Sequence, residues 1–182
     1  MERAIELFAN QGIGTTSVQQ ITEACGISKG AFYLAFKSKE DLILSIIDEF
    51  GKQFFLDVDR VVTSDQEVQE KLFQFYLTIF KFFEKHIDFG KMFIKEQHAR
   101  MNLDLKKKMK LFNELLNKAI LTLLRELYGE NIVKKQYDLL VCIRSFIEGF
   151  SRICHIIHYP MDTEILARSL VEKTNILAKG ST

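Results

Sequence analysis

The chain has 182 residues, of which 47 % are hydrophobic and 27 % are charged, with a formal net charge of +1. This balance supports a sizeable core and a soluble surface, and it argues against indiscriminate binding to nucleic acid. No apolar run reaches the ~18 residues of a transmembrane helix, and Met1-Glu2-Arg3 leads directly into an amphipathic segment rather than a signal peptide, so we expect a cytoplasmic protein.

Long stretches without helix-breaking residues indicate an all-α fold. The chain contains one proline and nine glycines, and its apolar residues recur mostly at helical spacing. The first helix is expected from Ala4 to Gln11, with Gly12-Ile13-Gly14 ending it. The three cysteines are widely spaced and odd in number, so we interpret them as reduced thiols packed like small apolar residues rather than as a disulfide framework.

The stretch from Ser17 to Phe36 predicts two short helices joined by a tight turn. Gly26 stands where a helix ends best, because glycine accepts a left-handed backbone without penalty. Ser17 and Ser28 are expected to cap the two helices with their hydroxyls. The apolar contacts between the helices are assigned to Ile21, Cys25, Ile27 and Phe32. This layout is that of a helix-turn-helix reader of DNA.

Residues 28–42, SKGAFYLAFKSKEDL, closely resemble the signature of the TetR (tetracycline-repressor) family. Upstream matches extend the resemblance over about the first 47 residues, although Ala35 and Thr22 depart from the common pattern. The resemblance implies a DNA-binding set, with Gly30 permitting close approach and Tyr33 reaching a phosphate or a thymine methyl. We assign to this set Ser28, Lys29, Gly30, Phe32, Tyr33, Lys37 and Lys39, and, as phosphate contacts at the preceding helix start, Thr16 and Ser17.

The remainder of the chain is predicted to be helical, giving about nine helices in all. A capping box of Ser64 with Glu67 is expected to open the fifth helix, and Asp88-Phe89-Gly90 to interrupt the chain after it. We expect the helices that follow the reader to cover residues 39–62, 65–86, 91–100, 103–128, 133–158 and 163–178. The domains are then a helix-turn-helix DNA-binding domain, 1–47, and a larger helical ligand-binding and dimerisation domain, 48–182.

The larger domain is heavily biased towards phenylalanine, with sixteen in the chain and no tryptophan. Most of these rings are expected to pack in the core. The family resemblance additionally implies an inducer pocket with apolar walls and few polar groups. An apolar or aromatic ligand, including a cationic one, suits such walls. The candidate lining residues are Tyr76, Phe80, Phe83, Met92, Phe93, His98, Met109, Phe112 and Leu116.

The last two long helices predict a homodimer. The segment from Val133 to His158 is apolar on more than one face, so Ile143 and Ile147 can cover the chain's own core while another stripe needs a different cover. The alternative is that both stripes are buried within one chain. For a two-fold four-helix interface, which also resembles the usual dimer of the family, we assign Phe146, Gly149, Phe150, Ile153, Ile157, Leu166, Leu170 and Ile176.

No catalytic constellation, phosphate-binding loop or cofactor motif occurs in the sequence. Cys154 and His158 share a helical face and are the one pair that begins a metal site, but further ligands would have to come from elsewhere, so we expect no metal. The sequence therefore predicts a ligand-released repressor that binds a palindromic operator as a dimer. The alternative is a helical small-molecule-binding protein or enzyme with an incidental helix-turn-helix.

Overall fold

The computed structural model describes residues 1–95, 103–156 and 161–180, without the side chains of residues 93–95 and 155–156. These residues confirm the all-helical prediction and contain no strand. The elements are α1 (Glu2–Gln11), α2 (Val18–Cys25), α3 (Lys29–Ala35), α4 (Lys39–Val62), α5 (Val68–Lys85), α6 (Ile87–Lys95), α7 (Leu103–Tyr128), the 3-10 helix η2 (Gly129–Lys134), α8 (Gln136–Ile156) and α9 (Thr163–Lys179).

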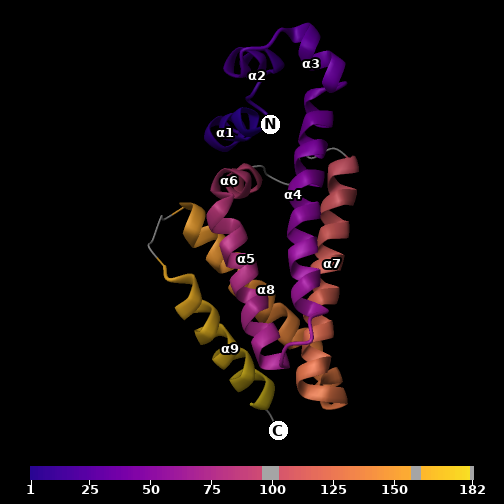
Figure 1. Cartoon of the computed structure of the whole chain (residues 1–182), viewed down its shortest axis with the longest axis vertical. Helices are drawn as coiled ribbons and strands as arrows, with labels where there is room; N and C mark the ends of the chain where they lie inside the picture. The colour runs from indigo at the N-terminus through magenta and orange to yellow at the C-terminus, as the bar shows by residue number, and fades with distance from the viewer. Residues whose placement is uncertain (96–102, 157–160, 181–182) are drawn as a thin grey trace.

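The molecule is elongated, with the helix-turn-helix at one end and the C-terminus at the other (Figure 1). Helix α4 runs from the end that carries α2 and α3 deep into the second half of the molecule, alongside α7 (Figure 1). It is unbroken across residues 47 and 48, so the domain boundary placed there stays a prediction. None of the described helices combines the length and the apolar character that a bilayer span demands.

Two apolar cores hold the helices together, and α4 contributes to both. The first core joins α1, the reader and α6, with Phe8, Ile46 and Met92 completely buried. The second core joins α5, α7, α8 and α9 around side chains such as Phe75 and Leu124. The reader therefore shares an apolar core with α1 and α4, and α6 packs on α1.

Helix ends follow local chemistry at most positions. The hydroxyl of Ser38 accepts from the Asp41 N–H, the carboxylate of Asp162 accepts from two N–H groups of α9, and Gly129 adopts a positive φ of 66° after α7. These three ends lie where the sequence predicts them. Helix α8, in contrast, begins at Gln136 because the preceding residues form η2.

Two predicted boundaries are wrong. The Ser64 hydroxyl donates to the Val61 carbonyl at 2.9 Å and so closes α4, while α5 begins after Glu67 without a side-chain cap. Asp88-Phe89-Gly90 does not interrupt a helix but lies inside α6. The Phe89 ring stacks on Phe50 of α4 at a centroid distance of 4.5 Å, so a tertiary contact overrides the low helix propensity of glycine.

Buried polar contacts tie α9 and α7 to the bundle. The Tyr76 hydroxyl lies 2.9 Å from the Thr174 hydroxyl, and the Tyr128 hydroxyl donates to Asn175 at 2.6 Å. Burial raises the pKa of Tyr128 to about 12, so its hydroxyl stays protonated and available as a donor. Lys71, which is buried, donates to the Glu126 carboxylate at 2.7 Å. Paired in this way, these groups fix the relative positions of the helices.

Candidate functional site

The turn between α2 and α3 has the geometry predicted for a helix-turn-helix. Ser17 and Gln20 form a reciprocal capping box at the start of α2. Gly26 adopts the left-handed conformation, with φ 64° and ψ 32°, and the next N–H, of Ile27, bonds to the Thr22 carbonyl at 3.0 Å. The Ser28 hydroxyl then accepts from the Ala31 N–H at 3.0 Å and starts α3.

Helix α3 is anchored by a single buried side chain. Phe32 is 2 % exposed and packs in the first core, with the half-buried Phe36 beside it at a ring distance of 5.7 Å. Every other residue of α3 is exposed. The helix is therefore held by one face and presents nearly all of its remaining surface to solvent.

Three predicted DNA contacts have internal roles instead. Phe32 is buried, so it supports α3 and does not reach a base. Thr16 is 1 % exposed, and its hydroxyl donates to the Gly12 carbonyl at 2.7 Å while accepting from Gln11. The Lys39 ammonium donates to the carbonyls of Ile13 at 2.7 Å and Thr16 at 2.9 Å. Thr16 and Lys39 thus hold the α1–α2 loop against α4, because this loop leaves carbonyls unpaired by any helix.

The remaining predicted contacts lie on the surface. Ser17, Ser28, Lys29, Gly30 and Lys37 are exposed, and Tyr33 is 53 % exposed. The Lys29 ammonium donates to the Gln19 side chain at 3.3 Å, which holds it beside α2. These side chains come from the start of α2, from α3 and from the loop after it, and they remain a predicted DNA-binding set.

Sequence reasoning overlooked Leu34 and misplaced two neighbours of the turn. Leu34 is 91 % exposed and Ile27 is 44 % exposed, and Cys25, expected to pack between the helices, is exposed as well. The signal for Leu34 was present, since it lies off the i, i+4 stripe of Phe32 and Phe36 that faces inward.

An aromatic cavity of about 300 Å³ lies in the larger domain, between α4, α5, α6, α7 and α8. Seven phenylalanine rings line it, and among the described residues of its wall Glu148 is the one charged side chain. Four predicted ligand contacts line this cavity, namely Phe83, Met109, Phe112 and Leu116. Tyr76, Phe80 and Met92 do not: they are buried in the two cores. The side chain of Phe93, and His98 as a whole, lie outside the described residues.

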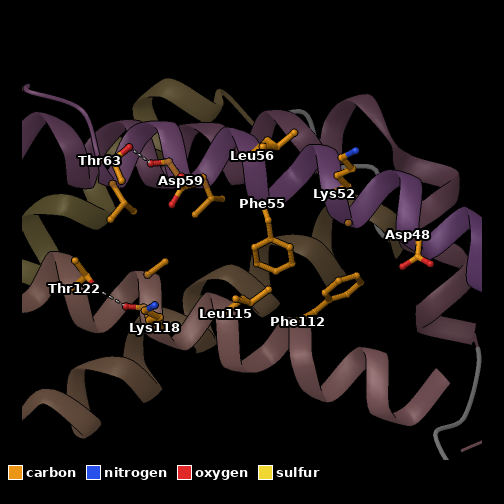
Figure 2. A pocket seen from close by; sticks show the side chains of 14 residues that line it. Asp48, Lys52, Phe55, Leu56, Asp59, Thr63, Phe112, Leu115, Lys118 and Thr122 are labelled. Atoms are coloured by element: carbon orange, nitrogen blue, oxygen red, sulfur yellow. Dashed lines mark hydrogen bonds between the residues drawn. The ribbon is translucent and has the colours of Figure 1, made fainter. Parts of the chain in front are cut away.

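A second hollow, an open groove of about 650 Å³, runs between α4 and α7. Figure 2 shows the rings of Phe55 and Phe112 between the two helices, with Lys52 on α4 near Phe112 and Lys118 on α7 on the far side of Phe55. Gly51, Phe55 and Phe112 line both the groove and the aromatic cavity, so they form the wall that separates the two spaces. A Cβ placed on Gly51 would lie only 2.3 Å from the Phe112 Cζ, which means that the ring rests directly on the glycine.

His86 lies where α4, α5 and α6 meet, next to the cavity. Its ring contacts those of Phe50 at 4.9 Å and Phe82 at 4.7 Å, and both of these phenylalanines line the cavity. Burial, with a smaller contribution from the positive charge of Lys85, lowers the pKa of His86 below its ordinary value. Near neutral pH the ring is therefore uncharged and packs as part of an aromatic cluster.

The residues predicted for the dimer face differ in their exposure. Phe150 and Leu170, which the sequence analysis assigns to the dimer interface, are instead buried in the chain's own core, where Phe150 packs on Phe80 at a ring distance of 4.2 Å. Phe146, Gly149 and Leu166 are half-buried. Ile153 and Ile176 are exposed by 39 % and 67 %, and Ile157 lies outside the described residues. Tyr137, Val141 and Ile165, which the sequence reasoning missed, are also exposed on these helices.

The described residues contain no group of three or more histidine, cysteine, aspartate or glutamate side chains placed to hold a metal ion. Cys154 is half-buried, and burial raises the pKa of its thiol, which keeps the sulfur in its neutral form. His158, its predicted companion, lies outside the described residues.

Comparison with known proteins gives a family match for the helix-turn-helix end of the chain. Residues 1–46 match the family model of bacterial regulatory proteins, tetR family. The chain is 28 % identical, over 186 aligned positions, to the uncharacterized HTH-type transcriptional regulator YerO of Bacillus subtilis. That alignment covers 99 % of this chain and 63 % of YerO, so the chain spans less than two thirds of this curated relative.

Two solved structures share the whole fold. A TetR family regulator, PfmR of Thermus thermophilus, superposes with a TM-score of 0.80 at 22 % identity, covering 95 % of this chain and 94 % of its own. The transcriptional regulator FadR of Bacillus subtilis, solved in complex with stearoyl-CoA, gives a TM-score of 0.77 at 21 % identity, covering 100 % and 97 %. At these identities the comparison establishes the fold.

Proposed function

Because its residues 1–46 belong to the tetR family of bacterial regulatory proteins, we propose that this chain is a DNA-binding transcriptional repressor that acts as a homodimer and is released by a small ligand. The observation that carries the proposal is the reader itself. The turn at Gly26 sets α3 against α2, and α3 rests on Phe32 while its other side chains face outward. This is the arrangement by which a recognition helix enters the major groove.

Specific binding requires two readers. The first 47 residues carry Arg3, Lys29, Lys37 and Lys39 against five acidic side chains, and the Lys39 ammonium is directed at carbonyls of the protein. One reader therefore makes few phosphate contacts, and phosphate contacts supply most of the affinity. A two-fold dimer would place a second reader one helical turn of DNA away, about 34–36 Å. The exposed apolar residues of α8 and α9, which include Ile153 and Ile176, are the proposed interface.

The proposed ligand site is the aromatic cavity. Its wall of phenylalanine rings favours an apolar or aromatic ligand, and Glu148 together with the ring faces also suits a cation. FadR of Bacillus subtilis has been solved with stearoyl-CoA, whose acyl chain is apolar. A long acyl chain is therefore the second ligand class, with the groove beyond Phe112, and Lys52 and Lys118 within it, available for a charged head.

Helix α6 connects the cavity with the reader. Phe89 and Gly90 line the cavity, and Met92, less than one turn further along α6, is fully buried in the first core with residues of α1. A ligand that displaces Phe89 would therefore press α6 against α1 and change the orientation of the reader on α4. Release from DNA requires that the ligand binds the DNA-free form better than the DNA-bound form.

DNA flanking the chain's own gene is the first probe, since regulators of this kind often act on neighbouring genes. Fluorescence anisotropy should give saturable binding that unlabelled random DNA competes for weakly. Lys29→Ala should lower the affinity on every sequence and reduce the salt slope by about one unit. The control is Lys173→Ala at the far end of α9, where the ammonium contacts Ser169 and no effect on DNA binding is expected. Equal affinity for the flanking and the random DNA would refute the proposal.

Thermal shift measurements test the ligand. At a concentration 100 times its Kd, a ligand stabilises the folded state by about 2.7 kcal/mol, which raises Tm by about 5–10 °C in a chain of this size. The panel should contain neutral aromatic, cationic aromatic and acyl-CoA compounds. A compound that raises Tm should also weaken DNA binding. Stabilisation without any change in DNA affinity would separate the cavity from regulation.

A further inference from the structure

Leu34 is the most exposed large apolar side chain among the described residues, at 91 %, and it projects from the recognition helix. A single exposed leucine elsewhere would need no explanation. On α3, however, the neighbouring residues indicate a role for the exposed leucine. Gly30 precedes it by one turn on the same face, and a Cβ at Gly30 would meet only the Ser28 hydroxyl at 3.6 Å, so this face is open. Lys29 and Lys37 lie before and after the helix centre.

The composition of α3 leaves few ways to recognise a base. The helix reads KGAFYLA and contains no arginine, asparagine, glutamine or acidic residue. Together with lysine, those are the residue types that most often make specific hydrogen bonds to base edges in the major groove. Within α3 only Lys29 and Tyr33 carry polar side chains, and Lys29 is held towards Gln19. The centre of the reading face is therefore apolar.

The major groove offers one apolar group for such a face to contact, the C5-methyl of thymine. We propose that Leu34 is a specificity-determining residue that packs against a thymine methyl in each half-site, with Gly30 providing the room for the base edge to approach. This inference rests on the proposed function. Lys29 and Lys37 then position the helix on phosphates, which fixes the register without reading sequence.

Deoxyuridine provides a direct test, because it keeps every hydrogen-bonding group of thymine and lacks only the methyl. The first step is to identify a DNA sequence that the full chain binds, either in the flanking DNA or by selection from a random pool. Each thymine of the site is then replaced in turn, in both half-sites together. Burial of one methyl group corresponds to about a fourfold change in affinity, so the two half-sites together correspond to about fifteenfold.

The parent chain should lose about fifteenfold in DNA affinity when one symmetric pair of thymines is replaced by deoxyuridine. Leu34→Ala should bind the thymine and deoxyuridine sites with equal affinity. Tyr33→Ala, which removes the neighbouring ring, should keep the deoxyuridine penalty, and this result separates the two exposed neighbours on α3. Leu111→Ala, which truncates a leucine of similar chemistry on α7 that is 50 % exposed, serves as the control and should keep the penalty too. Helix content by circular dichroism should be the same for all variants, because Leu34 contributes little to the core.

The outcomes separate the inference from the function on which it rests. Specific DNA binding that no deoxyuridine substitution weakens would overturn the role of Leu34 and leave the repressor proposal standing. A penalty that persists in Leu34→Ala would overturn it as well, and would assign the methyl contact to another residue. Failure of the parent to bind any selected DNA would overturn both.

Discussion

The wall between the aromatic cavity and the outer groove can be tested through Gly51. Replacing a glycine in the middle of a helix with alanine ordinarily stabilises a protein by about 0.5–1 kcal/mol. At Gly51 the new methyl would lie 2.3 Å from the Phe112 Cζ, so the ring must move. Overpacking of this kind costs about 1–3 kcal/mol. The two terms together predict that Gly51→Ala destabilises the protein by about 0–2.5 kcal/mol.

Gly149 is the matched control, because it also lies within a long helix and a Cβ there would meet nothing within 4 Å. Gly149→Ala should stabilise the protein by about 0.5–1 kcal/mol, the propensity gain alone. Urea unfolding measures both variants, and the difference between them isolates the contact with Phe112. In a Phe112→Ala background the alanine at position 51 has room, so Gly51→Ala should there stabilise as much as Gly149→Ala does.

This double substitution is a thermodynamic cycle, and neighbouring side chains typically show couplings of about 0.5–3 kcal/mol in such cycles. If Gly51→Ala stabilises the parent as strongly as Gly149→Ala, the Phe112 ring does not rest on Gly51. The wall between cavity and groove would then have to be formed in another way. Because Gly149 belongs to the predicted dimer face, all variants are compared in the Ile176→Glu background, in which the chain is expected to be monomeric.

Three further predictions address the dimer, the reader and pH. Ile176→Glu should sediment as a monomer with the fold intact, since Ile176 is 67 % exposed, whereas the parent should sediment as a dimer. The control Leu111→Glu should remain dimeric, and a monomeric parent would contradict the proposed interface. Lys39→Met should destabilise the reader by about 1.5–3 kcal/mol, because its ammonium bonds two carbonyls; unchanged thermal unfolding would refute that role. Because the pKa of His86 is lowered in the folded chain, the unfolded chain binds more protons. The stability that neutral His86 contributes should therefore be complete above its ordinary pKa of about 6.5 and be lost as the pH falls through the lowered pKa of the folded chain. The Tm of His86→Phe should depend less steeply on pH than the Tm of the parent between about pH 7 and 5. Equal slopes for the two proteins would refute the assignment.

Several features of this protein are determined within a few residues of sequence. Ser17 and Ser28 cap their helices, and Gly26 and Gly129 end theirs at positive φ, as predicted. Each of these choices depends on a side-chain hydroxyl or a backbone conformation that acts on groups up to three positions away. The helix-turn-helix, its resemblance to the tetR family and the all-helical fold could therefore be predicted from the sequence.

Tertiary packing decided which side chains are available to a partner. Periodicity placed Phe150 and Leu170 on apolar stripes, but only the packing of α5, α8 and α9 buries them within one chain. In the same way, Thr16 and Lys39 look like phosphate contacts until the α1–α2 loop supplies carbonyls 23 and 26 residues from Lys39 for its ammonium. The contact of Phe112 with Gly51 and the continuation of α6 through Gly90 likewise depend on neighbours distant in sequence. Local spacing shows which residues share a face, whereas the rest of the fold determines whether that face meets the core, a ligand or DNA.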